Sequence, residues 1–189
     1  MERMNNITIK QAQEADIPVL ESILLDTVCW VSEMGDPLWN KEDVVWEKLS
    51  RNYQISDFYI AYIDDISSGC MALIDHDPFF WPEVNKGESL FIHKLAVTKV
   101  ARKSGVSGVM MDFFKEQGAV RGVRTIRLDT DALRKKTMAY YERHGFVLKE
   151  IKIMGRFHVA FYIYTLPDTV LAQNKIIVKV KTAYYIMSW

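Results

Sequence analysis

Hydrophobic and polar residues recur along this chain with two periods, which predict its strands and helices. Alternation with period two, or a short apolar run, is typical of a strand, whereas apolar residues spaced i, i+3, i+4 and i+7 indicate an amphipathic helix. We therefore expect strands around residues 7–9 and over 58–63, 69–74, 90–97, 125–130, 146–153 and 158–166. Helices are predicted from about 17 to 31 and over 41–52, 106–117 and 132–144.

Residues at the ends of these segments support the assignment. Asp16 and Asn40 are suited to cap the first two helices, because a short polar side chain can accept a hydrogen bond from the first turn. Gly145 is placed to end the last helix in the left-handed conformation. Asp64-Asp65 lies between two strands and predicts a hairpin turn.

The helix over 106–117 has the strongest helical signal in the chain. Its apolar residues follow the spacing of one helix face, and Gly118 or Gly122 is placed to end it. A strand precedes it and another follows, so this span predicts a strand–helix–strand unit. The apolar residues are Val106, Val109, Met110, Phe113 and Phe114.

Composition narrows the class of protein. The chain has 189 residues, of which 49% are hydrophobic and 25% charged, which suits one compact domain with one main core. Its formal net charge of zero argues against nucleic acid as a partner, and no apolar run approaches the length that spans a bilayer. We expect a cytoplasmic protein with no membrane partner. Cys29 and Cys70 lack the spacing of a zinc site or disulfide framework, so no metal is expected.

The junction before the helix over 106–117 is suited to bind an anion. The first turn of a helix has backbone N–H groups without intrahelical partners, and the helix dipole adds positive potential there. Gly105 and Gly108 let an anion approach the backbone closely, because neither has a Cβ. Lys99, Arg102 and Lys103 place positive charge beside it.

The order of these motifs resembles that of the GNAT superfamily of acyl-CoA-dependent N-acetyltransferases. Leu95-Ala96-Val97 is followed by Arg102-x-x-Gly105-x-Ser107, and then by a Tyr-x-x-x-Gly-Phe sequence that begins at Tyr141. The resemblance covers about residues 7–166. Ser107 stands where the family has Gly or Ala, which is a mild departure because serine is also small.

The resemblance implies a fold and a cosubstrate. The fold is α/β (α+β), with a central mixed, mostly antiparallel sheet of six to seven strands that is splayed at the acetyl-CoA site and flanked by about four helices. The pantetheine arm of acetyl-CoA would pair with the strand before the loop, and the pyrophosphate would bind the loop and the helix start. The residues implied are Leu95, Ala96, Val97, Arg102, Lys103, Ser104, Gly105, Val106, Ser107, Gly108 and Val109.

Arg134 departs from the family pattern, in which this position is often Asn and helps to hold the pantetheine. With Lys135 and Lys136 it could reach the phosphates of CoA. Alternatively, these three residues form a solvated helix face, which is the usual meaning of a short charge run.

Acyl transfer to an amine needs a base for the amine and a proton for the leaving thiolate. Tyr141 stands at the family's general-acid position, although it could instead be a packed aromatic residue. His93 is the candidate base, since some family members carry a histidine there. Glu88 and water are the alternatives, and His93 could simply hydrogen-bond to a neighbour.

The acceptor site of this fold draws on the first two helices and the segment before the central strand. Trp30, Glu33, Trp39 and Trp81 would there suit a small cationic amine, through aromatic faces and carboxylate charge. The alternative is that the tryptophans are core or lid residues.

Together these expectations describe an enzyme that transfers an acetyl group from acetyl-CoA to a primary amine of a small molecule, by direct attack in a ternary complex. The alternative is a catalytically silent acyl-CoA-binding protein that acts as a sensor or assembly partner. We assign residues 1–167 to the acetyltransferase domain. Residues 168–189 would form a C-terminal extension, either an extra strand that pairs with a second subunit of a homodimer or a poorly ordered tail.

Overall fold

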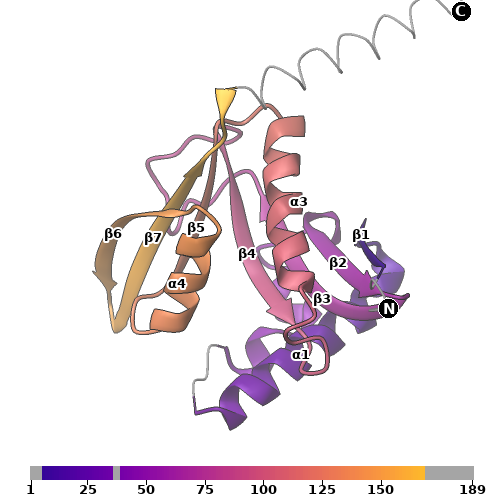
Figure 1. The fold of residues 1–189 in the computed structure, drawn as a ribbon. Helices are drawn as coiled ribbons and strands as arrows, with labels where there is room; N and C mark the ends of the chain where they lie inside the picture. Colours follow the sequence, from indigo (N-terminus) through magenta and orange to yellow (C-terminus); the bar gives the residue numbers. More distant parts are fainter. Residues whose placement is uncertain (1–5, 36–38, 169–189) are drawn as a thin grey trace, which may run out of the picture. The chain divides into compact units, whose positions relative to one another are not determined.

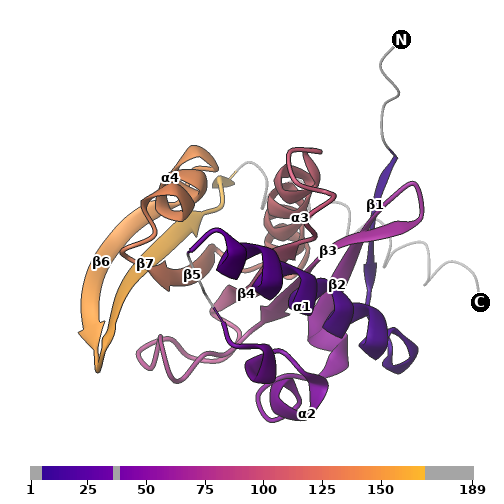
Figure 2. The same cartoon turned by 90° about the horizontal axis from the view of Figure 1, so that it is seen from below.

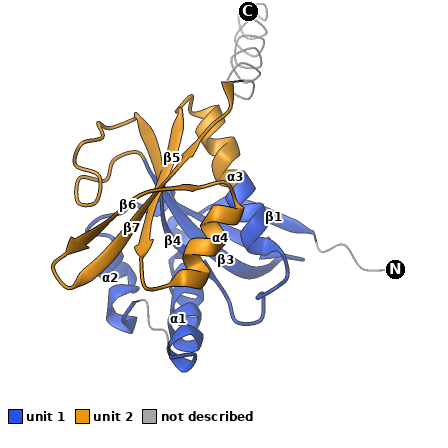
Figure 3. Ribbon diagram, turned by 60° about the vertical axis from the view of Figure 1, so that its left-hand side comes forward, with its two compact units in different colours: residues 1–74, 92–112 blue, residues 75–91, 113–189 orange. Residues whose placement is uncertain are grey.

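The computed structural model describes residues 6–35 and 39–168 and divides the chain into two compact units (Figure 3). Unit 1 comprises residues 1–74 and 92–112, and unit 2 comprises residues 75–91 and 113–189. The described residues form seven strands in the order β1-β2-β3-β4-β5-β7-β6. They also form four α-helices and three short 3-10 helices. Strand β4 (Ser89–Val97) and helix α3 (Val106–Val120) each contribute residues to both units.

Unit 1 contains three antiparallel strands, β1 (Ile7–Gln11), β2 (Phe58–Ile63) and β3 (Ile66–Ile74). The turn between β2 and β3 has both Asp64 and Asp65 in the left-handed region, at φ 47° and 67°, as a tight hairpin requires, so the predicted hairpin is confirmed. Helix α1 (Ile17–Glu33) packs against β3 (Figure 2).

The core of unit 1 lies between α1 and the strands. One face of α1 is apolar and packs against the strands. It consists of residues at helical spacing that are at most 4% exposed, namely Leu20, Ile23, Leu24 and Val28. Their partners from the rest of the unit include Phe58, Ile60, Cys70, Ala72 and Ala96.

Unit 2 contains β5 (Thr125–Asp131), α4 (Lys135–Arg143), β6 (Val147–Met154) and β7 (Phe157–Thr165). Strand β7 pairs with β5 and with β6, in both cases antiparallel (Figure 1). The parallel pairing of β4 with β5 takes in Ser89–Phe91 and Thr125–Arg127, and β4 then continues to Val97.

The prediction of one continuous helix over 41–52 is wrong. A 3-10 turn, Lys41–Asp43, is followed by the extended residue Val45, and a single α-helical turn, α2 (Trp46–Leu49), begins only after it. The cause is a distant side chain, because the Glu21 carboxylate on α1 accepts the hydrogen bond of the Trp46 N–H. A second helix start therefore replaces the continuous helix.

The helix predicted over 132–144 starts later than expected. The Ala132 N–H donates to the His158 carbonyl on β7 at 2.7 Å, and the Leu133 N–H donates to the Asp131 side chain at 2.8 Å. Both residues are thus held in a turn, and α4 begins at Lys135. The capping predictions also fail in detail, since neither Asp16 nor Asn40 makes a side-chain cap bond to its helix.

The predicted fold class is confirmed, because the described residues form a mixed, mostly antiparallel seven-stranded sheet with four α-helices. No helix in this part of the chain is both long enough and apolar enough to cross a membrane. The predicted domain, 1–167, takes in residues of both units, and its boundary stays a prediction. The predicted extension, 168–189, lies outside the described residues except for Asp168, which pairs with Arg124 at 2.7 Å.

Candidate active site

The loop between β4 and α3 is fixed by backbone hydrogen bonds within unit 1. The Thr98 N–H donates to the Ser68 carbonyl at 2.9 Å, and the Ser104 N–H donates to the Ala101 carbonyl at 3.2 Å. Lys103 and Gly105 both have positive φ, at 64° and 87°. The Gly105 carbonyl then accepts the N–H groups of Gly108 and Val109, so the helix starts directly after the loop, as the sequence predicts.

Side chains of α1 contact the start and the middle of this loop. Trp30 Nε1 donates to the Val97 carbonyl at 3.1 Å, and Thr27 Oγ1 lies 3.1 Å from the same oxygen. A carbonyl oxygen has two lone pairs, so a ligand strand beside Val97 would rely on its N–H rather than on this carbonyl. Arg102 stacks on the ring of Trp30, with its guanidinium carbon 4.4 Å from the ring centre.

Two further residues expected at the acceptor site contact cations of the chain itself. Glu33 accepts a hydrogen bond from Lys99 Nζ at 2.7 Å, and this contact raises the pKa of Lys99. The ring of Trp39 lies under Lys94, whose Nζ is 4.7 Å from the ring centre. Together with the Trp30–Arg102 stack, these contacts place Trp30, Glu33 and Trp39 against cationic side chains of unit 1.

Trp81, the fourth residue expected at the acceptor site, is a core residue of unit 2. It is 1% exposed, and its ring packs edge-on against Phe161 with centroids 5.1 Å apart. Arg127 and Lys149 lie over the same indole, at 4.8 Å and 5.1 Å. Its ring is thus enclosed by protein groups and presents almost no surface to a ligand.

His93 lies on β4 within unit 1 and contacts an aromatic residue of the same unit. Its ring is edge-on to that of Tyr53, with centroids 6.0 Å apart. The next residue, Lys94, has φ 51°, which is unusual for a residue with a side chain inside a strand.

Next to His93, unit 1 has an open pocket of about 300 Å³, which we call the Lys94 pocket. Its wall includes Tyr53 and Lys94, and both connect it to His93, the first by ring contact and the second by sequence. Sequence reasoning missed this pocket, because its residues come from two distant segments and carry no motif. The lining residues are Asp43, Lys48, Leu49, Arg51, Asn52, Tyr53 and Lys94.

Glu88, the alternative base, lies just before β4 in unit 2. Its carboxylate accepts hydrogen bonds from the side chain and the backbone N–H of Asn85, at 2.7 and 3.2 Å. These bonds lower the pKa of Glu88. A carboxylate with a lowered pKa is a weaker proton acceptor near neutral pH.

Tyr141, the candidate general acid, is fixed by the end of α4. Gly145 has φ 85°, its N–H donates to the Glu142 carbonyl, and the Phe146 N–H donates to the Tyr141 carbonyl at 3.1 Å. This is a Schellman arrangement, and Gly145 ends the helix in the left-handed conformation, as the sequence predicts. The side chain is 9% exposed and contacts the rings of Phe146 and Tyr162.

Burial raises the pKa of the Tyr141 phenol, and the nearby Tyr140 and Asp129 raise it further. Tyr141 is therefore protonated over the whole physiological pH range, as a proton donor must be. Arg134, expected near CoA, is the residue directly before the first turn of α4, and its charge opposes the rise in the Tyr141 pKa.

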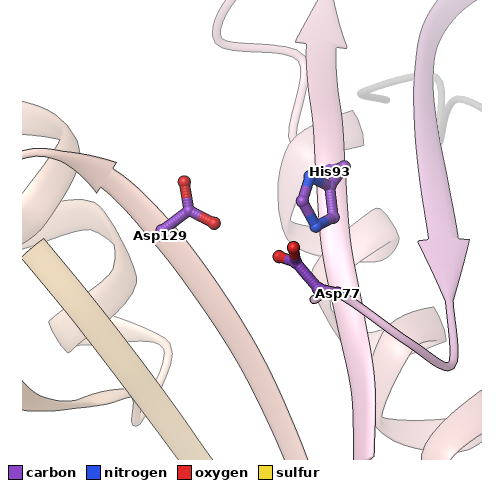
Figure 4. Close-up of side chains that lie close together, drawn as sticks. All are labelled: Asp77, His93 and Asp129. Atoms are coloured by element: carbon purple, nitrogen blue, oxygen red, sulfur yellow. The ribbon is translucent and has the colours of Figure 1, made fainter. Parts of the chain in front are cut away.

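Asp77 and Asp129 bring two carboxylates together in unit 2. Their oxygens lie within 4.8 Å of each other, and Figure 4 shows both side chains. Asp77 is 5% exposed and accepts the Phe80 N–H at 3.1 Å. The pair alone does not define a metal centre, because an ion held by one or two carboxylates takes its remaining ligands from water or substrate. That the reaction uses no metal stays a prediction.

Comparisons with known proteins agree with this geometry. A sequence model of the GNAT acetyltransferase family matches residues 26–146, which is more than half of the chain. No curated protein matches the sequence. The fold is similar to that of a GNAT-family acetyltransferase from Listeria monocytogenes, with a TM-score of 0.68 and 18% identity over 85% of this chain and 95% of that one.

Two further solved structures share the fold. One is the ribosomal-protein-S18-alanine N-acetyltransferase of Escherichia coli, with a TM-score of 0.62 and 15% identity over 85% of this chain and 94% of that one. The other is yncA of Salmonella typhimurium, solved with acetyl-CoA, with a TM-score of 0.59 and 12% identity over 86% and 95% of the two chains. The family match defines an acyltransferase. The chain belongs to the GNAT acetyltransferase family.

Proposed function

We propose that the protein transfers an acetyl group from acetyl-CoA to the primary amine of a small molecule, by direct attack of the amine in a ternary complex. The observation that carries this proposal is the hydrogen-bonded loop from Thr98 to Gly105, which leads directly from β4 into the first turn of α3. Such a helix start favours a pyrophosphate, because its N–H groups and dipole attract negative charge.

The donor would bind along β4 and the loop of unit 1. The N–H of Val97 and the backbone groups of Leu95 would pair with the amides of pantetheine, as an added strand pairs with an edge. The N–H groups at the start of α3 would bind the pyrophosphate, apart from those of Gly108 and Val109, which donate to the Gly105 carbonyl. Arg102, fixed on Trp30, would add positive charge beside it.

In the reaction the amine nitrogen attacks the thioester carbonyl carbon, and the C–S bond breaks as the amide forms. The attacking nitrogen must lose a proton and the leaving sulfur must gain one. His93, alone or through water, would accept the first proton. Tyr141 would donate the second to the CoA sulfur, and its raised pKa means only that the phenol holds its proton before that step.

Substitution of Tyr141 by Phe tests the acid role. We expect the rate of CoA thiol release with an amine acceptor to fall by about 10²–10⁴-fold, which is the usual range for loss of a general acid. Acetyl-CoA affinity, measured by calorimetry, should stay within about twofold of wild type, because the substitution keeps the ring.

Tyr164→Phe is the matched control, since it also removes a tyrosine hydroxyl of unit 2, from a ring that packs on Phe146. Its turnover should resemble that of the wild type. Equal turnover of Tyr141→Phe and Tyr164→Phe would exclude the acid role. Tight acetyl-CoA binding without turnover of any amine by the wild type would instead contradict the proposed transfer.

A further inference from the structure

We propose that the acceptor is a small amine that also carries a carboxylate, as an α-amino acid does, and that the Lys94 pocket binds this carboxylate. The inference rests on the proposed function, because it assigns a chemical class to the acceptor of that reaction. It adds a carboxylate to the small cationic amine that the sequence predicts.

The charge of the pocket favours an anion. Three of its lining residues, Lys48, Arg51 and Lys94, carry a positive charge, and one, Asp43, carries a negative charge. Asp43 also accepts a hydrogen bond from the Asn40 side chain at 2.9 Å. Arg51 has one acidic contact, Glu47 at 3.6 Å, and both side chains of that pair are mostly exposed, so the pair is weak. The pocket therefore has an excess of positive charge.

The pocket is placed beside the candidate base. Tyr53 lines it and also contacts the His93 ring, and Lys94 follows His93 directly on β4. Successive residues of a regular strand point to opposite faces, but the left-handed φ of Lys94 interrupts this alternation. An acceptor could thus place its carboxylate in the pocket and its amine near His93 within the same unit.

The groups that would attract a cation already contact cations of the chain. Trp30 stacks with Arg102, Trp39 lies under Lys94, and Glu33 binds Lys99. A cationic acceptor would have to displace these side chains and would then face the excess positive charge of the pocket. A carboxylate would compete with the single acidic lining residue, Asp43, and with the exposed Glu47, and it can form charge-assisted hydrogen bonds with arginine and lysine.

The test compares acceptors with and without the carboxylate charge. The twenty α-amino acids and their α-carboxamides are assayed with acetyl-CoA by thiol release, with spermidine as a purely cationic amine, and donor binding is measured separately by calorimetry. We expect at least one amino acid to exceed its own amide in kcat/KM by about tenfold, which corresponds to about 1.4 kcal/mol. Spermidine should be a poorer acceptor than that amino acid.

Charge variants locate the effect. Arg51→Gln and Lys48→Gln should each lower the acid-to-amide ratio by about 3- to 10-fold, through a higher KM for the acid, because each removes one cation from the carboxylate. The KM for acetyl-CoA should not change. Lys41→Gln is the control, since this exposed lysine lies in the preceding turn and does not line the pocket.

The outcomes separate the inference from the proposed function. If no amino acid exceeds its own amide in kcat/KM, the inference is overturned while the transferase proposal stands. The same holds if Lys41→Gln lowers the acid-to-amide ratio of kcat/KM as much as Arg51→Gln does. Donor binding with no turnover of any of these acceptors also overturns it. Failure to bind acetyl-CoA would contradict the proposed function itself, and the inference with it.

Discussion

At the scale of single residues, Gly69 shows how one missing side chain shapes the donor strand. A Cβ at this position of β3 would lie 2.8 Å from the Ala96 carbonyl oxygen and 3.1 Å from the Met110 sulfur. The first distance involves backbone, which cannot move aside as a flexible side chain can. Gly69 therefore permits the close approach of β3, β4 and the start of α3.

We expect Gly69→Ala to destabilise the protein by about 1–3 kcal/mol, the usual cost of overpacking. Since the new methyl group would displace Ala96, the KM for acetyl-CoA should also rise. Urea denaturation and steady-state kinetics measure the two effects. Ser67→Ala, on the same strand, should change stability by less than about 0.5 kcal/mol. A Gly69→Ala protein as stable as Ser67→Ala would show that the strands can separate without cost.

Single residues also show what a sequence can and cannot predict. The conformation of Gly145 is predictable, because a glycine that directly follows a helical pattern commonly ends the helix with positive φ. That of Lys94 is not, since a lysine inside an apolar strand gives no sign that its φ will be 51°. Its conformation depends on pairing across the sheet, which local sequence does not encode.

At the scale of elements, two glycines with nearly the same φ allow a controlled test of the loop from Thr98 to Gly105, which we call the donor loop because acetyl-CoA would bind there. Gly105 has φ 87° and ends the loop before α3, whereas Gly87 has φ 81° and lies before β4 in unit 2. An added Cβ would meet no atom within 4 Å at either position. Alanine at each should thus introduce the same backbone strain, of about 1–2 kcal/mol.

Only Gly105→Ala should weaken acetyl-CoA binding, by about tenfold, because the strain would shift the N–H groups that precede and begin α3. Calorimetry with acetyl-CoA on both variants measures the difference. Comparable affinity of the two variants, or an equal loss in both, would show that the conformation of Gly105 does not determine pyrophosphate binding.

Elements were predictable where local signals agreed. The helix over 106–117 has an apolar stripe, a glycine before it and Gly122 after it, and α3 forms there as Val106–Val120. The helix over 41–52 fails because the Glu21 carboxylate, 25 residues upstream of Trp46, takes the place of a local acceptor. A contact of this kind depends on the tertiary structure and leaves no local pattern.

At the scale of the molecule, the part of the candidate site formed by one continuous segment was predictable, and the part formed by distant segments was not. The donor loop is continuous in sequence, so its position and chemistry could be predicted from the residues together with the family resemblance. The Lys94 pocket combines residues 43–53 with a residue of β4, and no spacing links them. The acceptor was accordingly the part that the sequence left open.

Stability of the whole protein should fall at alkaline pH. Burial raises the pKa of the Cys70 thiol and of the Tyr141 phenol in the folded state. Unfolded, these groups titrate near 8.5 and 10, so above about pH 8.5 the unfolded chain holds fewer protons than the folded one. Each group contributes its full stabilisation at pH values below its pKa in the unfolded chain. This contribution to the free energy of unfolding is lost as the pH rises above that value. The raised pKa of Lys99 beside Glu33 acts in the same direction.

Urea denaturation from pH 7 to 10 measures this dependence. Between pH 9 and 10 the free energy of unfolding should fall by up to about 1.4 kcal/mol per pH unit for Cys70 alone. Cys70→Ala should be less stable at pH 7, because a buried side chain is shortened, yet its stability should fall less steeply over this interval. Cys29→Ala is the control, since Cys29 is only partly buried and should leave the slope unchanged. Identical slopes for wild type and Cys70→Ala would mean that the Cys70 thiol ionises without unfolding the protein.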